Sequence, residues 1–322
     1  MRAVRVHEFG GAAVLRLEEI ATPAAGPGQA VVALEVADVI FLDTLLRGGW
    51  GQEYFPLTLP YVPGLGGAGV VLSVGPDVDP AWVGRRVIAR GAGAYAEQVA
   101  FAAENLVAVP AGLPSTSAAA MIHDGATALL LVRRAEIVPG AWVLVSAAAG
   151  GAGSLLVQLL RDAGARVIAA ARGARKLDLA RELGAEVTFD YSADGWQHQV
   201  REVSGGVGVA YDGAGGALGQ ATFEAVAEGG RFVTYGSSDG LTSIDPAEAE
   251  QRRVRVDDVL AAGAPAPEVV RELLSDALAL TAEGRIRPVI SATYPLEEVE
   301  RAHRSLEERG TLGKSLLLVQ PR

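Results

Sequence analysis

The strongest local indication of the fold is Trp142-Val-Leu-Val-Ser-Ala-Ala-Ala-Gly-Gly-Ala-Gly153, which the helix-like run Ser154-Leu-Leu-Val-Gln-Leu-Leu-Arg161 follows directly. Its glycine-rich turn is a variant of the GxGxxG motif, with Ala148, Gly150 and Gly153 at the three marked positions. Such residues permit a tight turn, a close backbone approach to a pyrophosphate, and close packing of helix on strand. The helix start would present free N–H groups to the phosphates. The stretch predicts a dinucleotide site, and the alternative is an ordinary strand-to-helix turn.

The residues after the second strand indicate which dinucleotide is bound. An NAD site would place an acidic residue about 20 positions beyond the motif, to bind the ribose 2′-hydroxyl. Arg172 stands 19 positions beyond Gly153, and Arg175 and Lys176 follow it. These cations would pair with the extra phosphate of NADPH, each charged hydrogen bond contributing about 1.5–3 kcal/mol. We therefore expect NADPH; the alternative is a solvated helix start.

From about Ser115 onward, short apolar runs alternate with long Ala- and Leu-rich helical segments. The strand-like runs are residues 142–145, 166–169, 186–189, 209–211 and 231–234. Strands that alternate with helices at this spacing predict a parallel sheet wrapped by helices. Gly164 and Gly184 mark the ends of two of the helices.

The first 112 residues have a different pattern. Short β-type runs are separated by glycine and proline, which predicts an irregular all-β domain. The last forty residues return to strand-like runs around a charged helix at 296–309, and we expect them to rejoin the first domain.

Composition excludes several classes of protein. The chain has 322 residues, a formal charge of −10 and no cysteine, which excludes disulfides, thiolate metal sites and a thiol nucleophile. Without a basic block, a nucleic-acid surface is not expected. No two of the four histidines stand at ligand spacing, so no metal site is expected. The start predicts a strand rather than a signal peptide, and the uncharged stretch 137–160 predicts strand, turn and helix rather than a membrane span. We expect a cytoplasmic protein.

Several motifs, in order and spacing, match one family along nearly the whole chain. Among them are Asp43-Thr-Leu-Leu-Arg47, Gly125-Ala-Thr-Ala128, Tyr235-Gly-Ser237 and Gly313-Lys314, together with the turn at 148–153. The sequence resembles the medium-chain dehydrogenase/reductase superfamily, in its zinc-independent quinone oxidoreductase (zeta-crystallin-like) branch.

The resemblance implies a Rossmann doubly wound parallel sheet, residues 113–282, inserted into a GroES-like β-barrel catalytic domain, residues 1–112 and 283–322. It implies NADPH between the domains, with Tyr191 near the adenine side and Tyr235 near the nicotinamide end, and usually a homodimer. The implied cofactor contacts are Thr127, Gly150, Gly151, Ala152, Gly153, Arg172, Lys176, Tyr191, Gly213, Tyr235, Gly236 and Ser237.

The chain departs from the family at the barrel. Where zinc-dependent relatives carry a ligand cysteine this chain has Asp38, and where they carry Gly-His-Glu it has Gly64-Leu65-Gly66. Ile40 and Gly66 stand where zinc-free quinone reductases commonly keep Asn and Glu. The resemblance thus implies a barrel without zinc, which favours acceptors that need no Lewis acid, such as quinones and enones.

Candidate catalytic residues are few. His123 would donate a proton to the reduced acceptor, or His123 and Asp124 would cap the following helix. Asp43 would orient the barrel loop or pair with Arg47. The other histidines, His7, His198 and His303, are expected to be structural or solvent-facing.

A substrate pocket is expected at Ile40, Trp50 and Tyr54. The aromatic residues Trp50, Tyr54, Phe55 and Tyr61 lie in a glycine- and proline-rich loop. They would either line a pocket for an aromatic acceptor or close the barrel.

Together these observations predict an NADPH-dependent, metal-free reductase that transfers a hydride to a quinone or an α,β-unsaturated carbonyl compound. The alternatives are an enoyl or alkenal reductase of secondary metabolism, and a non-catalytic, crystallin-like NADPH-binding protein. No nucleic-acid or membrane partner is expected.

Overall fold

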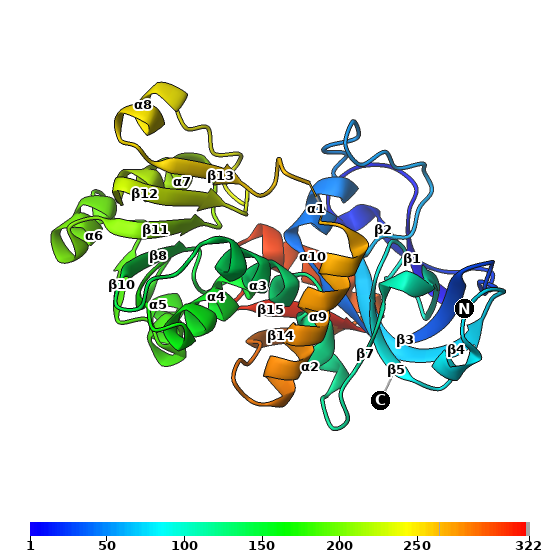
Figure 1. Cartoon of the computed structure of the whole chain (residues 1–322). Coiled ribbons are helices and arrows are strands. Elements are labelled where there is room, and N and C mark those ends of the chain that lie inside the picture. Colours follow the sequence, from blue (N-terminus) through cyan, green and yellow to red (C-terminus); the bar gives the residue numbers. More distant parts are fainter. Residues whose placement is uncertain (264, 320–322) are drawn as a thin grey trace. The chain divides into compact units, whose positions relative to one another are not determined.

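The computed structural model describes residues 1–263 and 265–319, and within them the chain divides into two compact units (Figure 1). The barrel unit comprises residues 1–126 and the described residues from Ala266 onward. The Rossmann unit comprises Thr127–Pro265. The chain thus leaves the barrel unit once and returns to it, as an inserted domain requires.

Among the described residues, the Rossmann unit contains a six-stranded sheet in the order β10-β9-β8-β11-β12-β13. Every ladder in it is parallel. Numbered along the unit, the order is 3-2-1-4-5-6, which is that of a doubly wound dinucleotide-binding fold and confirms the expected fold class. The strands are β8 (Trp142–Ser146), β9 (Arg166–Ala171), β10 (Val187–Asp190), β11 (Val207–Asp212), β12 (Val226–Thr234) and β13 (Arg255–Asp258).

Helices lie between these strands and bury their apolar runs. Leu144, Ile168, Ala210 and Phe232 are fully buried members of one core, as expected for strands covered on both faces. Gly184 takes a left-handed conformation at the end of α5, which is the stop that the sequence predicted. The helices between the strands are α4 (Gly151–Asp162), α5 (Ala174–Leu183), α6 (Trp196–Ser204), α7 (Gly216–Glu224) and α8 (Pro246–Gln251). Helix α3 (Asp124–Arg134) precedes β8, and its first three residues belong to the barrel unit.

The described part of the barrel unit contains a seven-stranded sheet in the order β14-β15-β3-β4-β5-β7, with β6 also paired to β3. A separate β1-β2 pair packs beside it in the same core. The strands are β1 (Arg2–Val6), β2 (Leu15–Glu19), β3 (Gln29–Val39), β4 (Gly66–Val74), β5 (Arg86–Arg90), β6 (Gln98–Ala102), β7 (Leu106–Ala108), β14 (Ile290–Pro295) and β15 (Lys314–Leu318).

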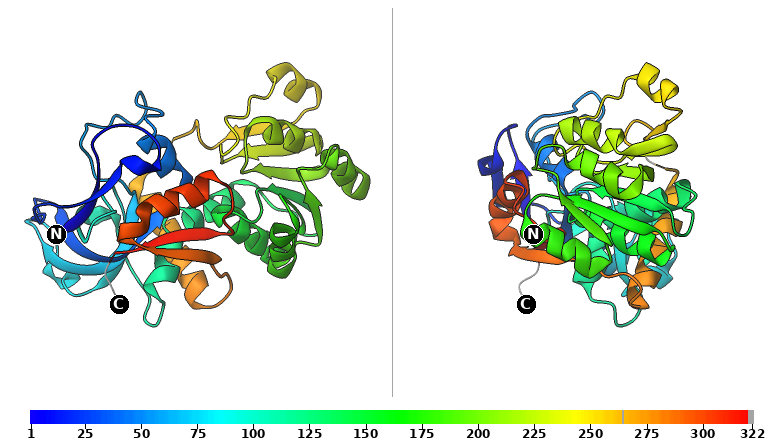
Figure 2. Two further views of the ribbon diagram at one scale, coloured as in Figure 1. Left: turned by 180° about the vertical axis from the view of Figure 1, so that it is seen from behind. Right: turned by 90° about the vertical axis from the view of Figure 1, so that its left-hand side faces the viewer.

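The C-terminal segment completes this sheet. Strand β15 pairs antiparallel with β3, and Leu316 lies opposite Asp38. Figure 2 shows this red segment beside the blue and cyan strands. The expectation that the last forty residues rejoin the first domain is confirmed. Four helices accompany the strands in the described barrel unit: α1 (Phe41–Arg47), α2 (Ser115–Ala120), α9 (Pro267–Ala282) and α10 (Val299–Glu307).

The unit boundaries differ from the expected residues 112 and 283. Helix α2 packs on β3 and β4, and helix α9 packs on β7, so both belong with the barrel unit. Composition placed them in the Rossmann domain because their Ala- and Leu-rich patterns resemble those of its helices.

Within residues 1–263 and 265–319, no helix is long and apolar enough to cross a membrane. The uncharged stretch 137–160 instead folds mainly as β8, a turn and most of α4, as the sequence predicted.

Candidate functional site

The expected cofactor contacts gather at one edge of the Rossmann sheet. Because the strands are parallel, their carboxyl ends meet there. The turn at 147–150 follows β8, Arg172 follows β9, Tyr191 follows β10, Gly213 follows β11, and the loop 235–237 follows β12. Thr127 lies half-buried in α3. The Tyr211 hydroxyl donates a hydrogen bond to the Leu131 carbonyl in the same helix (3.2 Å).

The glycine turn has the geometry that the motif requires. Gly150 caps α4 in extended conformation, and the first helical hydrogen bond runs from Ser154 N–H to its carbonyl (2.9 Å). The N–H groups of residues 151–153 therefore have no partner within the helix. A Cβ on Gly153 would lie 2.4 Å from the Ala147 oxygen, so only glycine fits there.

Gly150 has a different reason to be glycine. A Cβ there would meet only the Ala147 oxygen, at 3.3 Å, and otherwise open space. Internal packing hardly demands glycine at this position, whereas a ligand close to the backbone would. Ala147 itself has φ +52°, a left-handed conformation that non-glycine residues rarely adopt.

The first charged side chains that follow β9 are positive, and the acid at the end of the neighbouring strand β10 already accepts hydrogen bonds. Arg172 is exposed, and Lys176 is half-buried in the first turn of α5. Asp190 at the end of β10 accepts hydrogen bonds from Gly173 N–H and from Ser192 (2.9 Å and 2.5 Å). The Ser192 bonds, that of Gly173 and the Arg172 charge lower its pKa. Gly173 and Ser192 already engage this carboxylate, whereas the charged side chains Arg172 and Lys176, which follow β9, are positive.

Asp212 organises the middle of this edge, and sequence reasoning gave it no role. It is fully buried at the end of β11. Its carboxylate accepts hydrogen bonds from Ser146 Oγ, Ala214 N, Gly215 N, Thr234 Oγ1 and Thr242 Oγ1, at 2.7–3.2 Å. One carboxylate thereby ties together the ends of β8, β11 and β12. The available signal was an acid at the end of an apolar strand, directly before glycine.

Two of the expected cofactor glycines are explained by packing. A Cβ on Gly213 would lie 2.5 Å from the Tyr235 hydroxyl, and a Cβ on Gly236 would lie 2.2 Å from the Gly213 oxygen. The turns after β11 and β12 therefore touch through their backbones. Ser237 follows in the same turn and is half-buried.

A second charged site lies in the barrel unit. Lys314, the first residue of β15, forms ion pairs with Asp38 Oδ1 and with Asp124 Oδ2 (3.1 Å to the latter). The other oxygen of Asp38 is 2.6 Å from His123 Nδ1. Asp38 is 1% exposed and the Lys314 side chain 5%. We call these four residues the Lys314 cluster.

The pKa shifts in the Lys314 cluster follow from burial and charge. Burial raises the pKa of Asp124, and it opposes ionisation of Asp38, but Lys314 and His123 outweigh it and lower the pKa of Asp38. The two carboxylates raise the pKa of Lys314 despite its burial. The ammonium is therefore firmly charged. Asp124 is the first residue of α3, where the helix-cap interpretation placed it, and its carboxylate pairs with Lys314.

Asp43 belongs to a third network. Its Oδ2 accepts hydrogen bonds from Ile40 N–H (2.9 Å) and from the Tyr95 hydroxyl (3.0 Å). It therefore orients the barrel loop at Ile40, and it does not pair directly with Arg47. Burial raises the pKa of Asp43 to about 7.

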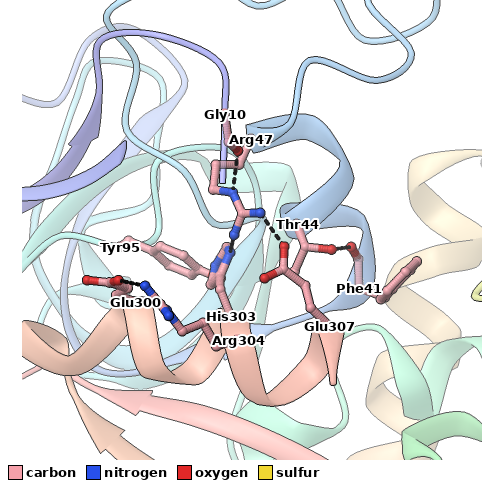
Figure 3. Close-up of polar contacts among 9 residues, drawn as sticks. All are labelled: Gly10, Phe41, Thr44, Arg47, Tyr95, Glu300, His303, Arg304 and Glu307. Atoms are coloured by element: carbon pink, nitrogen blue, oxygen red, sulfur yellow. Dashed lines mark hydrogen bonds and ion pairs between the residues drawn. The ribbon is translucent and has the colours of Figure 1, made fainter. Parts of the chain in front are cut away.

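The network continues from Tyr95 to the surface (Figure 3). Tyr95 Oη is 3.1 Å from His303 Nε2, and His303 Nδ1 is 3.1 Å from Arg47 Nη1. Arg47 only donates hydrogen bonds, so Nδ1 accepts and Nε2–H donates to Tyr95. Arg47 also binds the Gly10 carbonyl and forms an ion pair with Glu307. Burial, with the Arg47 charge, lowers the pKa of His303 to about 3. His303 is structural, which is one of the two roles expected for it.

The aromatic residues of the loop fall into two groups, and only one of these groups closes the barrel. Trp50, Tyr54 and Phe55 are exposed, by 43%, 72% and 41%, so they do not close the barrel. Tyr61 does, because it packs half-buried against the barrel core. Ile40 is half-buried and precedes α1. Trp50 lines an open pocket of about 390 Å³ together with Phe41, Thr44, Leu45, Arg47, Gly48, Glu307 and Arg309.

The barrel residues do not fit a zinc site. An ammonium group already pairs with Asp38 and Asp124, and a Cβ on Gly66 would lie 2.8 Å from both Ala89 O and Ile122 Cγ2. In the part of the chain that the structure describes, no three His, Cys, Asp or Glu side chains are grouped to hold a metal.

Family models match two parts of the chain. Residues 26–111 match the alcohol dehydrogenase GroES-like domain, and residues 183–317 match the zinc-binding dehydrogenase family.

Whole-chain relatives are also found. The chain is 31% identical to 2-haloacrylate reductase from a Burkholderia species, over 99% of each chain. It is 32% identical to quinone oxidoreductase from Pseudomonas aeruginosa, over 98% of this chain and 99% of the relative. Among solved structures, Escherichia coli quinone oxidoreductase complexed with NADPH superposes with a TM-score of 0.91 at 28% identity, covering 99% of this chain and 100% of that one. A mycobacterial protein complexed with NADPH gives 0.91 at 32% identity, with the same coverage.

Proposed function

The chain belongs to the quinone oxidoreductase branch of the medium-chain dehydrogenase/reductase superfamily, and we propose that it is an NADPH-dependent reductase of quinones or α,β-unsaturated carbonyl compounds that uses no metal. The observation that carries the proposal is the carboxyl edge of the Rossmann sheet. There, a glycine turn, a helix N-terminus and the exposed Arg172 follow adjacent strands.

Each part of that edge has a task in holding NADPH. The N–H groups at the start of α4 would bind the pyrophosphate, and Gly150 leaves it room. Arg172 and Lys176 would bind the 2′-phosphate, and Tyr191 would lie by the adenine. The turns tied by Asp212 would present residues 213 and 235–237 to the other end of the cofactor. Bound NADPH would supply the hydride.

The proposed acceptor class suits a site without a metal. A quinone or an activated alkene already stabilises the negative charge that hydride transfer creates, so it does not require a Lewis acid. The names of two relatives fit this class, because quinones and 2-haloacrylates are both conjugated acceptors. Ile40, Trp50 and Tyr54 remain our proposal for the acceptor pocket, and the exposure of the two aromatic side chains supports it.

The test is NADPH oxidation with three acceptors: a naphthoquinone, 2-chloroacrylate and an alkenal. We expect turnover of at least one acceptor, faster with NADPH than with NADH, and unaffected by a chelator. Tight NADPH binding without turnover of any acceptor would instead support the non-catalytic, crystallin-like alternative. Turnover confined to the alkenal would favour the enoyl or alkenal reductase.

The resemblance also leads us to propose a homodimer in the cytoplasm. Sedimentation velocity of the full chain checks the first point, and cell fractionation checks the second.

A further inference from the structure

We propose that His123 donates the proton that completes the reduction, and that Asp38 and Lys314 hold its imidazole for this task. The inference rests on the proposed function, because hydride transfer to a conjugated acceptor leaves an anion that must be protonated.

The geometry fixes which nitrogen of His123 can act. Asp38 is ionised against Lys314, and a carboxylate only accepts hydrogen bonds. His123 Nδ1 must therefore carry a hydrogen and donate it across the 2.6 Å contact to Asp38 Oδ2. Within residues 1–263 and 265–319, no residue forms a hydrogen bond with Nε2. A carboxylate that fixes one ring nitrogen and leaves the other for the reaction is the arrangement of general acid–base pairs.

The Lys314 cluster is closed at one end and open at the other. Its inner end, Asp38 and Lys314, is at most 5% exposed, whereas His123 keeps 13% of its side chain exposed and Asp124 18%. Gly66 contributes to the opening. A Cβ at that position would lie 3.5 Å from His123 Cε1, the carbon between the two ring nitrogens. A long side chain at position 66 would cover this edge of the ring, and glycine leaves it bare.

The charges around the ring suit an acid that releases its proton readily. Burial lowers the pKa of His123, Arg90 and Lys314 add to this effect, and Asp38 opposes it. Asp124, the remaining charged group of the Lys314 cluster, is paired with Lys314. The imidazolium is therefore a stronger acid than free histidine, but Asp38 stabilises the protonated form enough for it to be populated.

The proposed step balances. Bound NADPH would supply the hydride and leave as NADP⁺, so that an enone would become an enolate, or a quinone a hydroquinone monoanion. The His123 Nε2–H bond breaks, and the proton passes to the α-carbon or the oxygen of that anion. Neutral His123 keeps Nδ1–H on Asp38 and regains its Nε2 proton from water. The sum is acceptor, NADPH and H⁺ to reduced acceptor and NADP⁺.

The first test is His123→Asn. The asparagine amide can still donate to Asp38, but nothing replaces Nε2. We expect kcat with the acceptor that the wild type turns over to fall about a hundredfold, with the Kd for NADPH unchanged. In the wild type, kcat should fall as pH rises through the His123 pKa, below its ordinary value of about 6.5, and this limb should vanish in the variant. His198→Asn, at an exposed position of α6, is the matched control and should change neither quantity.

The second test, Asp38→Asn, concerns positioning. Loss of the negative charge makes the imidazolium less stable, so the limb should move to lower pH by about one unit or more. A role of Asp38 in folding alone would lower the yield of active enzyme and leave the limb in place. This variant also decides the question if His123→Asn does not fold.

The outcomes separate the two proposals. If the wild type oxidises NADPH with none of the three acceptors, the proposed function is contradicted. A wild type that turns over, with an unchanged kcat and pH limb in His123→Asn or an unmoved limb in Asp38→Asn, overturns this inference alone.

Discussion

The carboxyl edge of the Rossmann sheet and the Lys314 cluster are both charged sites, but they are built in opposite ways. The edge presents backbone N–H groups and the exposed Arg172, with its one fully buried acid, Asp212, bonded to its own loops. The Lys314 cluster consists of buried side chains that satisfy one another. The edge therefore suits the large anionic ligand that we propose for it, because the N–H groups at the start of α4 and the exposed Arg172 are not used by the buried Asp212. The ionised groups of the Lys314 cluster pair with one another, and among the described residues His123 Nε2 has no hydrogen-bond partner.

The largest expected effect comes from removing the cation of the Lys314 cluster. Lys314→Met leaves two buried carboxylates without their partner, so we expect the free energy of unfolding to fall by about 3–5 kcal/mol. Urea denaturation measures it. Arg181→Met, which breaks an exposed ion pair with Asp178, should change it by no more than about 1 kcal/mol. Equal effects of the two substitutions would mean that burial does not distinguish the pairs.

At the sheet edge, the largest effect should be on cofactor choice. Arg172→Ala removes a charged contact to the 2′-phosphate, worth about 1.5–3 kcal/mol. The ratio of kcat/KM for NADPH to that for NADH should therefore fall tenfold or more, and Lys176→Ala should act in the same direction. The exposed Arg181→Ala serves as the control. If the NADPH-to-NADH ratio stays constant in both variants, these cations do not bind the 2′-phosphate.

The two motif glycines should separate folding from binding. Gly153→Ala forces a Cβ against the Ala147 oxygen, so we expect both NADPH affinity and stability to fall, the latter by about 1–3 kcal/mol. Gly150→Ala, with more room, should weaken NADPH binding and leave stability nearly unchanged. Calorimetric binding and urea denaturation measure the two quantities. A similar loss of stability in both variants would contradict this division.

In the wild type, the smallest net effect is in the pH dependence of stability, because Asp43 and His303 oppose each other. The folded pKa of His303, about 3, is below its unfolded value, so stability from this group rises with pH from about 3 to 6.5. The folded pKa of Asp43, about 7, is above its unfolded value, so stability from that group falls from about pH 4 to 7. The two slopes, each up to about 1.4 kcal/mol per pH unit, cancel over most of this range.

Substitution of either partner should expose the other slope. Relative to the wild type, Asp43→Asn should become more stable as pH rises from 4 to 6.5, and His303→Gln should become less stable. Urea denaturation across this range gives both slopes. Slopes of the same sign in the two variants would show that these residues do not hold opposite protonation preferences.

The sequence predicted the parts of the molecule that depend on neighbours in the chain. Strand, glycine turn and helix at 142–161 follow one another within about twenty residues, and the C-terminal strand was recognisable by its composition. The role of Asp212 was missed because its partners come from three other segments. The aromatic loop was left open because exposure depends on what packs over each ring, which separated Tyr61 from Trp50, Tyr54 and Phe55.

From its residues alone, the sequence therefore predicted a parallel sheet wrapped by helices, a glycine turn of the dinucleotide-binding type and a C-terminal segment that rejoins the first domain, because period, turn chemistry and helix stops are local properties. The surroundings of His123 depend on the tertiary structure. Its partner Asp38 lies on β3, and Lys314, which pairs with Asp38, lies on β15; these strands are adjacent because β15 pairs antiparallel with β3, with Leu316 opposite Asp38. Register across such a distance in the chain is set by the packing of the whole barrel core, and it leaves no mark on the residues beside His123.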